Sequence, residues 1–380
     1  MICVFDKFTK IGHFDTCGER ILNPTKCMIH HDLNGDYSLQ LEQPILPDDD
    51  CHKFLQIYNI IKTSNGQLFF IYWIQRKLVN NVPTVIVKAK HIFYWLDFKV
   101  VYGMATTGST GWALHDVLPE IFNKTEWRDG PEYVNYRFEH SSDIYGGTDG
   151  FGNRIYEANG ISVAKAIFEC VDAWGGYLYR NNFKLSVHSE MEGSKANAFS
   201  AIHGWNVTDV TVTQDYTDHL TYITAKDNYA NGWADAQTSG GLAYQIERYL
   251  EFSYQDHSNL VKDGKAYFEA HFYPPLSYEL NLADLKDSSR ALGWDKLEHV
   301  NVGDTGWVES DILGIGTDQR VVSVDYDDLA RRNTSVKISN FQKSSLHPGR
   351  WDSTVSMGST PETKRIAALE KKGSYFTYID

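Results

Sequence analysis

Two short clusters in the first 52 residues contain side chain types that bind divalent metals. The first is His30-His31-Asp32, and the second runs over residues 48–52 and includes Cys51 and His52. Imidazole, thiolate and carboxylate groups are the usual ligands of zinc. Adjacent residues of an extended chain point to opposite sides, however, so neither cluster converges easily on one ion. We therefore interpret both clusters as solvated turns and predict no metal site.

Four acidic residues offer the carboxylate pairs that glycoside hydrolases use: Glu169, Asp172, Glu190 and Glu192. Glycoside hydrolysis requires two such groups about 5 to 10 Å apart in a shared cleft. Nothing in the spacing of these residues indicates a shared cleft, so we assign them to the surface.

His91 and residues 147–153 have ordinary structural interpretations. His91 lies among aromatic residues, and no acid is closer to it in sequence than Asp97, which favours a structural histidine over a catalytic one. Residues 147–153 resemble a calcium loop only loosely. They lack the alternating Asp and Asn ligands and the closing Glu, so we predict an ordinary loop.

Motifs that would identify an enzyme are absent from the sequence. It contains no H-E-x-x-H, G-x-S-x-G, Walker A or dinucleotide fingerprint. The nearest mimic, Gly314-Ile315-Gly316, lacks the third glycine, and no cysteine has a recognisable peptidase signature. We predict a protein that is not an enzyme, with no catalytic residue, no cofactor and no cofactor-binding residue.

Composition excludes several classes of protein. At 380 residues the chain is long for one core, which favours several domains. The net charge of −13 argues against general nucleic-acid binding, which requires clustered Lys and Arg. Five cysteines without a C-x-x-C pair exclude a disulfide framework and indicate folding in a reducing cytoplasm. We find no signal peptide, and apolar runs such as residues 68–74 are too short to span a membrane.

Alternating apolar residues predict strands in the first hundred residues, at 2–5, 37–41 and 84–90. Residues 53–76 form the clearest hairpin, with Ser64-Asn65-Gly66 at its turn, where Asn-Gly favours a type I′ turn. Residues 91–101 close this region.

Helical spacing appears after residue 103. Residues 112–122 predict a helix capped by Ser109 or Thr110, although Pro119 would kink or shorten it. Residues 162–174 predict a better helix, with Ser162 as its cap and glycines at 175 and 176 to end it. A strand pair at 177–187 turns at Asn181-Asn182. Helix and hairpin together predict a compact α+β unit.

Strand patterns return at 207–225, as two strands around residues 215–218, and at 267–272. A helix is possible at 242–250, residues 228–241 are candidates for a mobile segment or subunit contact, and residues 361–372 predict a short charged helix. Residues 299–340 alternate in short runs between turns, which predicts an antiparallel meander of three or four strands. In that meander we place Val322 and Val324 together in the sheet core.

The sequence of the meander also resembles that of a known protein family. Its segments VGD (302–304), LGI (313–315), RVVSVDYDDL (320–329) and SVKISN (335–340) resemble the closing β-domain of tail-tip hub proteins of long-tailed bacteriophages. That family includes the N-terminal hub part of tail-associated lysins. Further similarity lies in AKHIFYWL (89–96), DHLTYITA (218–225) and PPLSYELN (274–281), so the resemblance spans about residues 57–340.

The resemblance implies a β-rich α+β fold with two β-barrel-like hub domains and an inserted α+β domain. We expect a first barrel-like domain at 1–102, the inserted domain at 103–205, a strand-rich middle domain at 206–298 with a possible mobile segment at 226–260, a closing barrel-like domain at 299–345, and a tail at 346–380. About forty residues follow Asn340 in this sequence, so we do not expect the wall-degrading activity of related proteins here.

By the same resemblance, three chains form a ring at the tail tip or baseplate of the virion. This hub joins the tail tube to the host-binding apparatus and closes the channel until DNA ejection. The expected partners are two further copies of the chain, the neighbouring distal tail ring protein and the receptor-binding proteins. DNA passes through without specific binding, no membrane insertion is expected, and the protein is made in the host cytoplasm.

Two other functions stay open. Ten Trp and 23 Tyr could stack on sugars of a host-recognition glycan, although core and interface roles account for them as well. A cell-wall hydrolase using a carboxylate pair is the third hypothesis.

Overall fold

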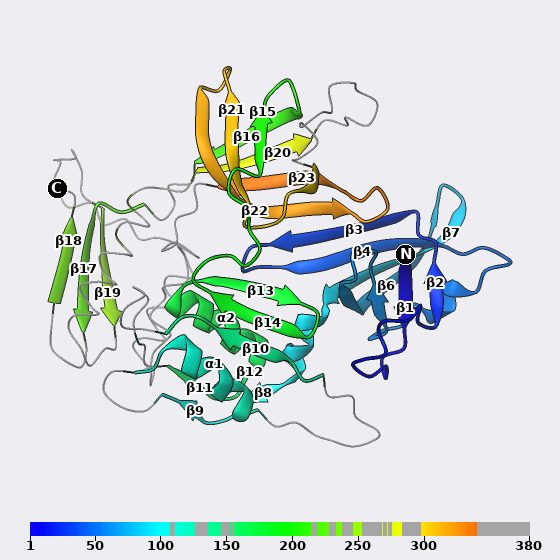
Figure 1. Ribbon diagram of the computed structural model, residues 1–380, viewed down its shortest axis with the longest axis horizontal. Helices are drawn as coiled ribbons and strands as arrows, with labels where there is room; N and C mark the ends of the chain where they lie inside the picture. Colours follow the sequence, from blue (N-terminus) through cyan, green and yellow to red (C-terminus); the bar gives the residue numbers. More distant parts are fainter. Residues whose placement is uncertain are drawn as a thin grey trace.

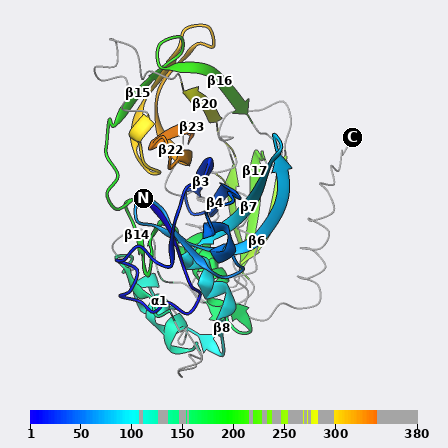
Figure 2. The ribbon, with the colours of Figure 1, turned by 90° about the vertical axis from the view of Figure 1, so that its right-hand side faces the viewer.

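The computed structural model describes residues 1–106, 111–125, 136–145, 153, 156–214, 219–227, 233–237, 246–252, 268, 272, 276–282 and 298–339. Its fold is β-rich with few helices. Figures 1 and 2 show the strands from the end of the described chain at one end of the molecule and helix α1 (Leu114–Asn123) at the other. Strands β3 (Lys26–Asp32) and β4 (Tyr37–Pro44) lie between these ends.

The first hundred residues form one half of a large sheet. It contains β3, β4, β1 (Ile2–Phe5), β2 (Arg20–Leu22), β5 (Ile60–Lys62), β6 (Leu68–Val79) and β7 (Val82–His91). Side chains of β4 alternate between buried and half-buried along its length, as a strand with one covered face requires. The predicted strands at 2–5, 37–41 and 84–90 are confirmed. Of the predicted strand at 53–63 only β5 forms, and Cys51–Phe54 is a 3-10 helix instead.

The predicted type I′ turn lies at a different hairpin. At the expected position only Gly66 has a positive φ, of 86°, whereas a type I′ turn needs two such residues. Asn80 and Asn81, with φ of 51° and 65°, supply both between β6 and β7. Asparagine tolerates this conformation better than most residues, so Asn-Asn was the local signal for this tight hairpin.

The second half of the sheet comes from the later chain. It contains β15 (Phe199–Ile202), β16 (Val207–Gln214), β20 (Leu276–Leu282), β21 (Thr305–Ser310), β22 (Ile315–Asp327) and β23 (Arg332–Ser339). The predicted meander is confirmed as the three antiparallel strands β21, β22 and β23.

Both halves join into one sheet of 13 strands because β22 pairs with β3, from Ser323 opposite Asp32 to Asp327 opposite Met28. The strand order is β16-β20-β23-β22-β3-β4-β7-β6-β5-β1-β2, with β15 and β21 attached through β22 (Figure 1). We expected two barrel-like domains, and among the described residues no closed barrel is present. The predicted domain borders stay a prediction.

A β-bulge corrects the expected register of β22. The pairing of β22 with β23 shifts between Val321 and Ser323, which places an extra residue, Val322, in the strand. A bulge reverses the alternation beyond it. The core therefore takes Val321 and Val324, whereas Val322 is half-buried at its edge.

The α+β unit lies below strands β3 and β4 in the view of Figure 1. Its main elements are α1, α2 (Val163–Trp174), β10 (Glu139–Ser142), β13 (Tyr177–Asn181) and β14 (Lys184–His188). Short pairs β8 (Val100–Val101) with β12 (Ile161–Ser162) and β9 (Met104–Ala105) with β11 (Glu157–Ala158) join it to the 3-10 helix Ile92–Phe98. Its buried apolar side chains belong to the same cluster as those of the first half-sheet, except Tyr177, which belongs to the cluster of the second half.

Both predicted helices of this unit are present. The Ser162 hydroxyl accepts a hydrogen bond from the Lys165 backbone N–H at 3.1 Å, and Gly175 follows α2 with a φ of 83°, so the expected cap and stop are confirmed. Helix α1 contains Pro119 and begins after Ala113. Its predicted caps, Ser109 and Thr110, lie outside the described residues.

A separate sheet contains β17 (Tyr222–Asp227), β18 (Trp233–Gln237) and β19 (Glu247–Phe252). The two strands predicted at 207–225 form as β16 and β17. The helix predicted at 242–250 is wrong over 247–250, because β19 pairs in parallel with β17 and takes its hydrogen bonds from that strand. Residues 147–152, 238–241 and 361–372 lie outside the described residues.

The strand predicted at 267–272 is also wrong at residues 268 and 272, the two residues of this range that the structure describes. Phe268 and Phe272 are both helical, and their rings stack with centroids 5.4 Å apart.

Candidate functional site

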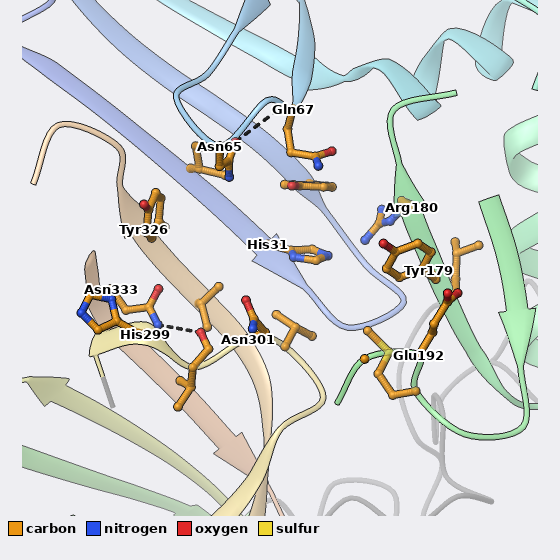
Figure 3. A pocket seen from close by; sticks show the side chains of 18 residues that line it. His31, Asn65, Gln67, Tyr179, Arg180, Glu192, His299, Asn301, Tyr326 and Asn333 are labelled. Carbon is orange, nitrogen blue, oxygen red and sulfur yellow. Dashed lines mark hydrogen bonds between the residues drawn. The ribbon is translucent and has the colours of Figure 1, made fainter. Parts of the chain in front are cut away.

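A cavity of about 550 Å³ lies where distant parts of the chain meet (Figure 3). Its walls come from β3 and β4, the loop after β5, strand β13, the segment before β21, and strands β22 and β23. The polar lining residues are His31, Asn65, Gln67, Tyr179, Arg180, Glu192, His299, Asn301, Tyr326 and Asn333. Small-molecule sites in proteins have volumes of roughly 300 to 1,000 Å³, so a ligand fits this space.

Hydrogen bonds from two sides hold the loop between β5 and β6. The Asp328 carboxylate accepts hydrogen bonds from the Ser64 backbone N–H at 2.8 Å and its hydroxyl at 2.6 Å. The Asn182 side chain accepts from the Leu68 backbone N–H at 2.9 Å and donates to the Gly66 carbonyl at 3.1 Å. These bonds hold Asn65 and Gln67 at the cavity wall.

Asn34 docks the α+β unit against the turn between β3 and β4. It is 3% exposed and has a φ of 52°. Its side chain donates to the Gly176 carbonyl at 3.0 Å and accepts from the Leu178 backbone N–H at 2.7 Å. Strand β13 is therefore held beside the sheet, and Arg180 on that strand reaches the cavity.

Three rings stack beside the cavity. Tyr37 lies between His31, at a centroid distance of 4.1 Å, and His91, at 4.4 Å. The Nδ1 atom of His91 accepts from the Phe93 backbone N–H at 3.2 Å, and its Nε2 lies 3.1 Å from the Gln67 side chain oxygen. Burial and the charge of Arg180 lower the pKa of His91 well below its ordinary value. His91 is thus a neutral, buried partner of the stack.

His31 lines the cavity itself and is half-buried. Burial and the nearby positive charge of Arg180 lower the pKa of His31 to about 3, so its ring is neutral at physiological pH. Figure 3 shows the end of the Arg180 side chain directed toward His31.

His30, the neighbour of His31, points to the other side of β3, as adjacent strand residues do. Its Nδ1 lies 2.7 Å from Asp325 on β22 and its Nε2 lies 3.1 Å from Asp32. Hydrogen bonds to Asp32 and Asp325 raise the pKa of His30 to about 10. The cluster His30-His31-Asp32 is therefore divided between a strand pairing and the cavity.

The second metal-like cluster makes local contacts. The Asp49 carboxylate accepts from the Cys51 backbone N–H at 2.9 Å, and Asp50 lies 3.3 Å from Arg20. No group of three or more His, Cys, Asp or Glu that could hold a metal occurs in the part of the chain that the structure describes.

The four candidate carboxylates lie in two places. Glu169 and Asp172 are on α2, where Glu169 accepts from the Tyr156 hydroxyl at 3.1 Å. Glu190 and Glu192 follow β14, and of the four only Glu192 lines the cavity, with an oxygen 3.1 Å from Nε2 of His188.

Sequence reasoning missed Arg180 and Tyr37 as lining residues. Arg180 donates to the Gly35 carbonyl across 145 residues of sequence, and no local pattern marks such a contact. The only available signal was an arginine in a strand whose neighbours are mostly apolar.

Within the described part of the chain, no helix has the length and apolar character that a membrane crossing requires.

Comparisons with known proteins agree on one class. Residues 195–346 match the family model described as prophage endopeptidase tail. No curated protein sequence matches the chain.

Three solved structures share its fold. The prophage tail protein gp18 from Listeria monocytogenes EGD-e has a TM-score of 0.62 at 15% identity, over 90% of this chain and 95% of its own. The 43 kDa tail protein of prophage MuSo2 from Shewanella oneidensis has a TM-score of 0.59 at 12% identity, over 91% and 99%. A tail protein from Neisseria meningitidis MC58 has a TM-score of 0.59 at 11% identity, over 89% and 96%. The chain therefore has the fold of prophage tail proteins, and its resemblance to the tail-tip family of bacteriophages is confirmed.

Proposed function

We propose that the chain is a structural component of a siphophage tail tip or baseplate, a trimeric hub. It joins the tail tube to the host-binding apparatus and closes the channel until DNA is ejected. The observation that carries this proposal is the fold shared with three tail proteins over 89% to 91% of the chain. The two halves of the sheet, joined by β3 and β22, would be the two barrel-like parts that each chain contributes to a pseudo-sixfold ring.

An open strand edge supports assembly. Strand β5 pairs with β6 only over residues 68–70, and from Tyr72 to Val79 the described partner of β6 is β7 alone. Leu78 is 69% exposed and Tyr72 is 43% exposed on this projecting hairpin. A strand edge without a described partner that exposes apolar side chains is a template for contact with another chain. Closure of a ring then requires that this edge meet a different surface of the next copy.

The proposal includes the neighbours of such a hub. These are the distal tail ring protein and the receptor-binding proteins, in the virion, with synthesis in the host cytoplasm. DNA would pass through the ring without specific binding, in keeping with the net charge of −13.

We infer a non-enzymatic role, although the matched family is named for an endopeptidase. Both ring nitrogens of His91 are hydrogen-bonded to groups that are not nucleophiles, which leaves it without a catalytic partner.

The test is the absolute mass of the purified full chain by light scattering on a sizing column, followed by electron micrographs of the peak. We expect a trimeric ring. Leu78→Asp should yield monomers with an unchanged Tm, whereas Ile312→Asp, at a side chain 81% exposed on the turn after β21, should assemble normally. A wild-type chain that remains monomeric at high concentration would contradict the hub.

The same preparation distinguishes the alternatives. Saturable binding to host wall polysaccharide would favour a glycan-binding module. Release of wall fragments, lost when one acidic residue is substituted, would favour a hydrolase.

A further inference from the structure

The wall of the cavity contains a buried cation, Arg180, that forms no ion pair with a described carboxylate. Arg180 is 5% exposed, and its Nη1 and Nη2 donate to the carbonyls of Gly35 at 2.7 Å and Asp32 at 3.1 Å. Among the described residues its Nε–H has no hydrogen-bond partner, and no carboxylate of that part of the chain lies within ion-pair distance of it. The rings of Tyr37 and Phe93 lie 5.4 and 5.6 Å from the guanidinium carbon and offset only part of the charge. A buried N–H of a charged group that makes no hydrogen bond raises the free energy of the folded state, so a hydrogen-bond acceptor next to Nε of Arg180 would be stabilising.

A second donor lies beside it. His31 lines the same cavity, and its ring is fixed in orientation by stacking on Tyr37 at an interplanar angle of 16°. No described residue hydrogen-bonds to its ring nitrogens, and a neutral imidazole carries one N–H donor. Arg180 and His31 both line the cavity, and Figure 3 shows the end of the Arg180 side chain directed toward His31, so this wall offers two donors to a carboxylate.

We propose that this cavity binds a small organic carboxylate, whose oxygens are held by Arg180 and His31. The apolar wall of Ile29, Val300 and Val324 would cover its carbon skeleton, and the side chain amide of Asn301 would meet a hydroxyl or carbonyl group. The volume of about 550 Å³ admits a ligand of one or two ring-sized units.

The charges in the cavity favour a monoanion over a phosphate dianion. Among the described residues of the lining, Arg180 is the only arginine and none is a lysine, and Glu192 places a carboxylate in the same wall. Glu192 is held there by His188, at 3.1 Å, and by the hydroxyl of Ser186, at 3.4 Å. One cation beside one carboxylate gives only a small net attraction, which does not offset the larger cost of removing a doubly charged ligand from water.

Two sources supply such a carboxylate, a sugar acid and the free end of a peptide. The test uses the full wild-type chain with glucuronate and N-acetylalanine as probes, and with glucose and N-acetylalanine amide as neutral controls, in calorimetric titration and thermal melts. We expect one of the two acids to bind with a Kd of about 1 mM or tighter and to raise the Tm. The acid that binds identifies the source, and the neutral controls should not bind.

Variants locate the site. Arg180→Lys keeps a positive charge but has no Nε–H at this position, and we expect binding about tenfold weaker. His31→Phe keeps a ring that can stack on Tyr37 and removes both ring nitrogens, so it tests the site even where the lysine variant does not fold, with an expected loss of about fivefold. Lys184→Ala, on the same hairpin but paired with Glu139 at 3.3 Å, should bind like the wild type.

Failure of both acids to bind, equal binding of the neutral controls, or unchanged affinity in His31→Phe would overturn the proposal. None of these readouts depends on whether the chain forms a ring, so a failed hub and a failed ligand site are distinguished.

Discussion

His30 and Asp325 are 295 residues apart in sequence, yet their side chains meet at 2.7 Å. Their strands, β3 and β22, are the ones whose pairing unites the two halves of the sheet. The contact therefore connects the two halves of the sheet, and its strength contributes to the stability of their pairing.

Stability should depend on pH through His30. The pKa of His30 is raised from 6.5 to about 10, so its ion pairs stabilise the fold fully below about pH 6.5 and lose their effect as the pH rises toward 10. Burial opposes ionisation of Asp32, but hydrogen bonds from His30 and Ser323 outweigh it and lower the pKa of Asp32, so this stabilisation is lost on the acid side below about pH 4.

His30→Gln should therefore cost about 1 kcal/mol between pH 4 and 6.5, a value reduced for the partial solvent exposure of these groups, and nearly nothing above pH 10. Urea unfolding across that range measures it. His13→Gln, at an exposed histidine, is the control and should leave the curve unchanged. A cost that does not vary with pH would contradict the ion pair.

The bulge in β22 is tested by two neighbouring substitutions. Val324 is 7% exposed in the apolar cluster, and Asp at this position buries an unpaired charge, with an expected loss of about 4 kcal/mol or more. Val322→Asp should cost about 1 to 2 kcal/mol, since that side chain is half-buried. Equal losses in chemical denaturation would mean that the alternation continues without a bulge.

Asn34 combines two buried hydrogen bonds with a left-handed backbone. Asn34→Gly removes the bonds and should cost about 2 kcal/mol of unfolding free energy, and Asn34→Ala should cost about 1 kcal/mol more because alanine resists this φ. At Asn197, which has a φ of 52° but is exposed, Gly should match the wild type and only Ala should destabilise. Thermal melts of the four variants separate the two effects.

Asp328 links the last strands to the loop after β5. It is 3% exposed, and Asp328→Ala leaves the Ser64 N–H and hydroxyl without their acceptor, at an expected cost of about 2 to 3 kcal/mol. A double-mutant cycle with Ser64→Ala should show coupling of about 1 kcal/mol. Asp318→Ala, at an exposed residue, serves as the control. Strict additivity of the two substitutions would argue against the contact.

Thiol reactivity should single out Cys17. All five cysteines are free thiols, and only Cys17 is exposed, while Cys3, Cys27, Cys51 and Cys170 are buried. A thiol reagent such as DTNB should label one cysteine of the native chain and five after denaturation. Cys17→Ser should abolish the native reaction, and a second rapidly reacting thiol would show that one of the buried positions opens.

Local patterns in the sequence determined many of the elements. Alternation of apolar residues located β1, β4 and β7, and the cap at Ser162 with glycines 175 and 176 located α2. The order of several short strand and turn motifs was enough to indicate the resemblance to phage tail proteins. Each of these signals depends on residues within a few positions of one another, where backbone geometry and side chain preference act directly.

Only the tertiary structure decided how the two halves of the sheet pair and where the cavity lies. The pairing of β3 with β22, the docking of Asn34 on β13 and the position of Arg180 beside His31 all join residues more than a hundred positions apart. Local preference also failed where partners from elsewhere won, as for β19, which is a strand because β17 supplies its hydrogen bonds. Contacts of this kind depend on which faces meet after folding, and that information is spread over the whole chain rather than held in any one segment of it.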